Sequence, residues 1–223
     1  MINTFRVSGH QLDLVLPATW VTIPLQPQSV RARDVRILVQ RQFRGVDNQP
    51  LLRTETEHQL LVSADRAADA GADFLALSLM QVAGVPIPAS MVAHSIPLES
   101  GDPRESTGCL AVLDRIIESL GDVESQHPAA RLARGRVAAG DVLRRVAHRP
   151  GHGIEGSDPP TVIVADYWLP WPDDHGTALL CFSTPLTTHQ EPMLELFDAI
   201  VESVHWTSPG DSEDIDPEEI RDR

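Results

Sequence analysis

The stretch "TVIVADYWLPWPDDHGTALLCFST", residues 161–184, decides the fold. It contains two runs rich in β-branched, aromatic and aliphatic residues, a composition typical of strands. The segment between the runs contains Pro, Asp and Gly, which favour a turn. Counted by twos, both faces of the first run are apolar, since Ile163 and Ala165 alternate with Val162 and Val164. Because a strand with two apolar faces is covered on both sides, we expect this hairpin in the middle of a sheet.

Outward from this hairpin, the chain alternates strand pairs with helices. Strand patterns occur near 12–25, 72–98 and 131–149. Apolar residues at helical spacing predict helices at about 29–43, 51–70, 106–121 and 188–204, with Ser29 as the N-cap of the first. Hairpins placed between helices favour an α+β fold, a mostly antiparallel sheet flanked by helices.

We expect one domain of residues 1–207, followed by a tail of residues 208–223. The tail holds seven acidic residues and two arginines, with almost nothing to bury, and is predicted to be disordered. The helix before it has a row of acidic residues that we expect on its solvated face: Glu191, Glu195, Asp198 and Glu202.

The amino-acid composition limits the kinds of molecule that we expect the chain to bind. The 223 residues include 18 basic and 32 acidic ones, all the basic ones being arginine, for a net charge of −14. This charge argues against nonspecific nucleic-acid binding and against docking on anionic lipid. The two cysteines are far apart and fit reduced thiols of a cytoplasmic protein. No signal peptide and no apolar run of membrane-spanning length is recognised, so we expect a cytoplasmic chain.

Asp173, Asp174 and His175 are the most tempting candidates for a metal or catalytic site. A metal needs three or four ligands, and no second cluster at ligand spacing follows nearby. Asp and Gly after Pro172 suit a turn between strands, which is the favoured interpretation. Two loop histidines, His148 and His152, leave open a small-ligand or metal-dependent hydrolase as the alternative function.

Three possible nucleophiles give no convincing catalytic pattern. Ser183 lacks the G-x-S-x-G elbow that exposes a nucleophilic serine. Cys181 lies within a strand. Cys109 lies in the first turn of a predicted helix, where a thiol pKa can be lowered, but no histidine is near it in sequence. We therefore predict no catalytic residue, no metal and no cofactor.

Two groups of residues are candidates for binding a partner. One hairpin carries a third of the arginines and forms a local positive patch, either a charged sheet edge or a docking site for an acidic partner or the chain's own tail: Arg131, Arg134, Arg136, Arg144, Arg145 and Arg149. Trp168 and Trp171 would anchor a partner if they were exposed. The residues we select are Trp168, Trp171, Arg134, Arg136, Arg144 and Arg145.

Three motifs resemble the Mog1/PsbP-like fold of the LpqN and DcrB-type families, in particular uncharacterised actinobacterial proteins. They are "LVLPATWVTIPL" (14–25), "LLCFSTP" (179–185) and "MLELFDAIVESVHW" (193–206). The resemblance covers the two ends of the chain and implies a sandwich of sheet and helices that binds other proteins. Together with the cytoplasmic location expected from the residues, it implies a non-catalytic interaction module, an adaptor or a secretion-type chaperone for a protein client. A homodimer is left open.

Overall fold

The computed structural model describes residues 2–7, 10–43, 49–83, 85–98, 108–124, 130–151 and 159–207. The predicted tail and His152 lie outside these residues. The helices and strands are, in chain order, β1 (Ile2–Val7), β2 (His10–Val15), β3 (Trp20–Pro24), α1 (Gln28–Gln42), α2 (Pro50–Asp69), β4 (Phe74–Ser78), β5 (Gln81–Val82), β6 (Val85–Pro86), β7 (Ser90–Pro97), α3 (Cys109–Glu124), β8 (Arg131–Val137), β9 (Gly140–Pro150), β10 (Thr161–Pro170), β11 (Gly176–Thr184), a 3-10 turn (Thr187–His189), α4 (Gln190–Glu202) and β12 (His205–Thr207).

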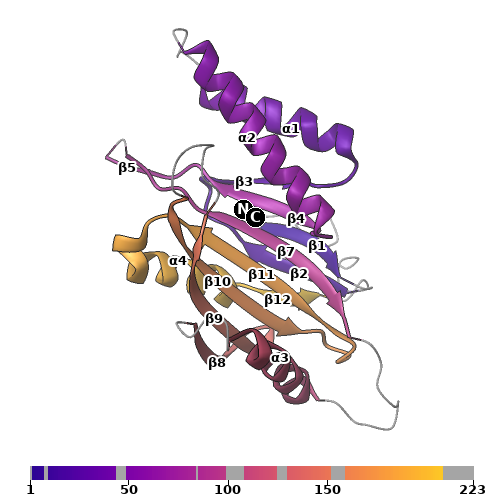
Figure 1. Cartoon of the computed structure of the whole chain (residues 1–223). Helices are drawn as coiled ribbons and strands as arrows, with labels where there is room; N and C mark the ends of the chain where they lie inside the picture. Colours follow the sequence, from indigo (N-terminus) through magenta and orange to yellow (C-terminus); the bar gives the residue numbers. More distant parts are fainter. Residues whose placement is uncertain are drawn as a thin grey trace, which may run out of the picture.

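The main sheet has seven strands in the order β3-β4-β7-β11-β10-β9-β8, and every neighbouring pair is antiparallel (Figure 1). The predicted α+β class is therefore confirmed. So is the central position of the 161–184 hairpin, since β11 is the fourth of the seven strands and β10 the fifth. A second sheet, β1-β2-β12, and the short β5–β6 hairpin complete the described strands.

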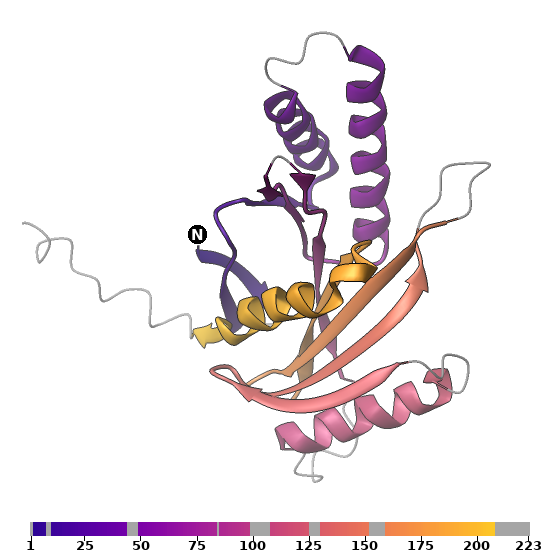
Figure 2. The ribbon, with the colours of Figure 1, turned by 90° about the vertical axis from the view of Figure 1, so that its left-hand side faces the viewer.

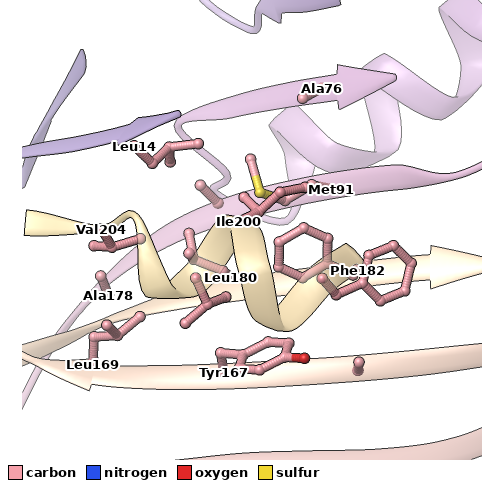
Figure 3. Close-up of a cluster of buried hydrophobic side chains, with 14 of the residues drawn as sticks. Leu14, Ala76, Met91, Tyr167, Leu169, Ala178, Leu180, Phe182, Ile200 and Val204 are labelled. Carbon is pink, nitrogen blue, oxygen red and sulfur yellow. The ribbon is translucent and has the colours of Figure 1, made fainter. Parts of the chain in front are cut away.

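The two faces of the main sheet pack against different helices. On one face, Leu180 and Phe182 of β11 point toward α4 and share a core cluster with Ile200 of α4 and with Val204, just after it (Figure 3). On the other face, α1 and α2 cover β3 and β4, and α3 covers β9 and β10 (Figures 1 and 2). The second sheet adds Leu12 and Leu14 to the core under α4.

The helices follow the predicted apolar stripes, with small differences at their ends. The residues of α4 that pack on the sheet are Met193, Phe197, Ile200 and Val201. Gly71, with φ +75°, follows the end of α2 as expected for a C′ glycine. The first helix begins at Gln28 rather than after Ser29, because the Pro27 carbonyl accepts the first intrahelical bonds, from the N–H groups of Val30 and Arg31.

Strands β1 and β12 were not predicted. The last helix was expected to continue to Val204, but it ends at Glu202, and His205–Thr207 pair with Gln11–Asp13 of β2. This pairing returns the chain to its own N-terminal region after α4. The C-terminal end of the described residues therefore lies beside β2.

Candidate functional site at the edge strand

The arginine-rich hairpin is β8 and β9, and β8 is the last strand of the sheet (Figure 1). Residues opposite one another in an antiparallel pair share a face. The register places Arg134 opposite Leu143, which packs under α3, and Ala133 opposite Arg144 on the α4 face. The arginines of the predicted local positive patch therefore divide between two faces, because side chains alternate along a strand.

Arg145 is buried on the α3 face. Its guanidinium donates to Asp166 Oδ2 at 3.0 Å and 2.5 Å and lies 5.3 Å from the ring centroid of Trp168. Arg145 is 8% exposed and Asp166 is 3% exposed. This buried ion pair belongs to the interior of the fold. The structure thus gives Arg145 a packing role in place of the predicted contact with a partner.

Arg144 lies on the α4 face in a small polar cluster. It donates to Asp198 Oδ2 at 2.5 Å, and the Tyr167 hydroxyl donates to Asp198 Oδ1 at 2.7 Å. Burial and the hydrogen bond to Asp198 raise the pKa of Tyr167, so it stays a hydrogen-bond donor at neutral pH. Asp198 was predicted on the solvated face of α4, and this prediction is wrong. The Asp198 side chain is half-buried and accepts hydrogen bonds from both Arg144 and Tyr167.

Arg131, Arg134 and Arg136 are exposed along β8. Arg134 forms an ion pair with Asp114 of α3, in which both side chains are about half exposed. A solvent-exposed pair of this kind contributes little to stability, on the order of 0–1 kcal/mol. The exposed guanidinium groups are therefore available to another acidic group at small cost.

A pocket of about 220 Å³ opens between β8, β9 and the last turns of α4. Arg144, Tyr167 and Asp198 line it, and Val137, Val142 and Val201 supply its apolar walls. Ala133 and Gly135 line it from β8. These two residues carry almost no side chain on the α4 face of β8, which keeps the pocket open beside the strand. We call β8 together with this pocket the edge site.

Both tryptophans selected as anchors are buried. Trp168 is 6% exposed and packs with Val112, Leu113 and Ile116 of α3. Trp171 is 2% exposed, and its ring covers Gly176 so closely that a Cβ there would lie 2.5 Å from it. Neither ring is presented to solvent, so the structure gives no support to their role as anchors. Trp168 is buried because α3 packs over it, and Trp171 is buried because its ring packs against the β10–β11 turn.

Asp173, Asp174 and His175 form the turn of the β10–β11 hairpin, as predicted. The Trp171 N–H donates to the Gly176 carbonyl at 2.9 Å, and Asp174 has φ +59°. The Asp173 carboxylate accepts from the His175 N–H at 3.1 Å, a local bond that favours the turn. Among the residues that the structure describes, no group of three or more His, Cys, Asp or Glu side chains could hold a metal.

The remaining candidates from the sequence lie apart from one another. Ser183 shares a hydrogen bond of 2.8 Å with Ser90 on the neighbouring strand. His148 is exposed on β9. Cys181 is half-buried, and burial, followed by the charge and hydrogen bond of Asp166, raises its pKa. These residues form no constellation with a nucleophile and a base in contact.

Cys109 begins α3, but its surroundings make the thiol less acidic. Burial, followed by the 3.1 Å hydrogen bond from Sγ to Asp174 Oδ1 and by the charge of Asp174, raises the pKa of Cys109 to about 11. A carboxylate that accepts from the thiol disfavours loss of its proton. The helix N-terminus does not outweigh these two effects.

We expect Cys109 to react with iodoacetamide at pH 8 on the order of 100-fold more slowly than an unperturbed thiol, because only the thiolate attacks and a pKa of about 11 lowers its fraction. Peptide mapping separates Cys109 from Cys181. The Asp174→Asn variant removes a charge that adds to the effect of burial on the pKa, so its Cys109 should react faster. A wild-type rate equal to that of a free thiol would contradict the assigned environment.

The sequence analysis did not identify Tyr167, Asp198 or the pocket. Tyr167 was only part of the predicted 161–184 hairpin, and Asp198 was assigned to a solvated row. One signal was present: Ala133 and Gly135 alternate with Arg134 and Arg136, so over residues 133–136 one face of β8 is nearly bare and the other is basic. That alternation is typical of a strand with an open surface on one side.

Comparison with known proteins gives a distant likeness to a solved structure. No family model matches the chain, and no curated protein matches it. The chain is similar to the crystal structure of LpqN, described as involved in cell envelope biogenesis of Mycobacterium tuberculosis. The identity is 12%, the match covers 93% of this chain and 91% of LpqN, and the TM-score is 0.47. A likeness at this level carries no functional argument, and the Mog1/PsbP-like membership stays a prediction.

One further finding concerns membranes. Of the helices in the described ranges, none is long and apolar enough to cross a bilayer.

Proposed function

We propose that this chain is a protein-binding module that takes an extended, acidic segment of a partner onto the outer edge of β8. The observation that carries the proposal is the edge site itself, an exposed strand bearing arginines beside an open pocket. An edge strand presents backbone N–H and C=O groups to an added strand. In such complexes the backbone bonds supply affinity and the side-chain pockets supply specificity.

The positive charge of β8 favours an acidic partner. Arg131, Arg134 and Arg136 lie on this strand of a chain with a net charge of −14. An acidic segment gains attraction at β8, whereas a basic segment would meet like charges. On the α3 face, partner residues would meet Arg134 and Arg136. On the α4 face, they would enter the pocket, which has apolar walls and is also lined by Arg144.

A second copy of the chain is a poor occupant of β8. Pairing β8 with β8 would set arginines against arginines, and like charges on facing strands are destabilising. The opposite sheet edge, β3, ends at Pro24, a residue that protects edges from further pairing. A homodimer, a cytoplasmic location and an adaptor or chaperone role stay predictions that the edge site does not require.

The proposal is tested with a fluorescein-labelled synthetic peptide of alternating aspartate and valine. We expect saturable binding that the double variant Arg134→Glu/Arg136→Glu weakens about tenfold or more, because two attractions become repulsions. The matched control is Arg33→Glu/Arg53→Glu, which reverses two exposed arginines on α1 and α2. This control should change the affinity little.

A second probe separates strand addition from simple charge attraction. The same peptide with N-methylated backbone nitrogens keeps its charges but cannot donate backbone hydrogen bonds. We expect it not to bind. If the unmodified peptide fails to bind, or if neither N-methylation nor charge reversal on β8 changes its affinity, the proposed function is wrong.

A further inference from the structure

Gly135 occupies a place in β8 where the fold itself does not require glycine. It lies inside the strand, exposed and opposite Val142 of β9. Among the described glycines, Gly71 and Gly140 have a positive φ, and Gly135 does not. A Cβ added at Gly135 would lie 3.4 Å from Val142 Cγ1, at the limit of ordinary van der Waals contact, so crowding does not require glycine either. Glycine weakens the interior of a strand and often marks a place where a ligand or another backbone approaches closely.

The pocket of the edge site begins directly beside this glycine. Gly135 and Ala133 line it from β8, Val142 lines it from β9, and Val201 lines it from α4. Its volume is about 220 Å³. A protein cavity of about 150 Å³ holds benzene. An aromatic ring therefore fits the pocket, whereas a side chain of the size of valine would leave much of it empty.

An aromatic side chain is also the group that best covers a glycine on a strand. A ring on the neighbouring strand shields the bare backbone and supplies the contacts that glycine lacks, and this pairing fixes the register of two strands. The guanidinium of Arg144 lines the same pocket and is held by Asp198 at 2.5 Å. A ring in the pocket would therefore lie beside a fixed cation, which is favourable when the cation meets the face of the ring.

The register of an added strand connects this pocket to the arginines of β8. In an antiparallel addition, the residue opposite Gly135 has its side chain on the α4 face, where the pocket lies. The residues before and after it lie opposite Arg134 and Arg136, with their side chains on the other face. Both arginines are exposed, and opposite charges on facing strands attract. Acidic residues therefore suit the two positions that flank the pocket residue.

We infer that the edge site recognises a tripeptide of an acidic, an aromatic and a second acidic residue, with the aromatic ring opposite Gly135 and inside the pocket. The inference rests on the proposed function, because it names the residues that the bound segment carries. The arginines attract many acidic segments, whereas the pocket accepts a ring at one position only. The ring thereby sets the register in which a partner binds.

The first test compares peptides on the wild-type chain. One central valine of the aspartate–valine peptide is replaced by phenylalanine. We expect this peptide to bind about tenfold more tightly than its parent, because the larger side chain buries more apolar surface in the pocket. The matched control peptide exchanges the phenylalanine with a neighbouring aspartate. It has the same composition, but its ring lies on the arginine face, so it should bind no more tightly than the parent.

The second test fills the pocket from the protein side with Gly135→Val. We expect the preference for phenylalanine over valine to fall below about twofold, while the parent peptide keeps its affinity within about threefold. The matched control is His148→Val, which places the same side chain at an exposed position of β9 outside the pocket lining. It should keep the full preference. Circular dichroism checks that both variants are folded, and the peptide comparison on the wild-type chain decides the inference even if Gly135→Val does not fold.

The outcomes separate this inference from the proposed function. If the phenylalanine peptide and its control peptide bind equally, or if folded Gly135→Val keeps the full preference, the pocket does not select a ring and the inference is overturned. The proposed function then stands, provided that the parent peptide still requires Arg134 and Arg136. If none of the peptides binds the wild-type chain, the proposed function fails together with the inference.

Discussion

Replacing Asp166 with asparagine is expected to lower the free energy of unfolding by about 3–5 kcal/mol, because it leaves the Arg145 charge buried without a counter-ion. Both partners are buried, at 8% and 3% exposure, under α3 and beside Trp168. Asparagine has nearly the shape of aspartate, so the loss reports the missing charge and not a cavity. Urea denaturation followed by circular dichroism measures it without relying on the nearby indole.

Two further variants test whether the loss of stability comes from the burial of the Arg145–Asp166 ion pair. The Asp114→Asn variant removes the same charge from the exposed pair with Arg134 and should cost at most about 1 kcal/mol. The double variant Arg145→Met/Asp166→Leu removes both buried charges and should recover most of the lost stability, since apolar pairs often replace buried ion pairs without loss. If Asp166→Asn and Asp114→Asn lowered the free energy of unfolding equally, the Arg145–Asp166 pair would not be desolvated, which would contradict its buried position in the structure.

The local patterns in the sequence predicted the local structure well. The 161–184 hairpin and its turn, the apolar stripe of α4 and the α+β class all depend on residues within a few positions of one another. Alternation and helical spacing are properties of such short windows. The sequence could also have predicted that Arg144 and Arg145 face opposite ways, because adjacent residues on a strand always do.

The parts that were missed depend on distant contacts. Strand β12 has three residues and pairs with β2, nearly two hundred positions earlier, which no window of the sequence contains. The sequence around Trp168 reads the same whether its side chain is exposed or buried. Only the packing of α3 against the sheet determines that it is buried. Asp198 was assigned to a solvated row, but Arg144 and Tyr167 approach it from other elements. The pocket arises from the same assembly of β8, β9 and α4.

Trimming Phe182 to alanine is expected to cost about 3–5 kcal/mol of stability, the range for large core aromatic residues. Phe182 is fully buried on β11. Its ring stacks on Phe197 of α4 at 4.7 Å between centroids and makes edge contacts with Tyr167 at 5.5 Å and Trp20 at 6.4 Å. Removing it leaves a cavity between the sheet and α4 that these neighbours fill only in part.

The same variant should also weaken the edge site, because α4 carries one wall of the pocket and Asp198. We expect Phe182→Ala to bind the aspartate–valine peptide less tightly at a temperature where it is still folded. Leu51→Ala, which trims a side chain that is 85% exposed on α2, should change stability by less than about 0.5 kcal/mol and leave peptide binding unchanged. Full peptide affinity in folded Phe182→Ala would show that the edge site does not depend on the packing of α4 against β11. The pocket would then be dispensable, and recognition would rest on the backbone and the arginines of β8 alone.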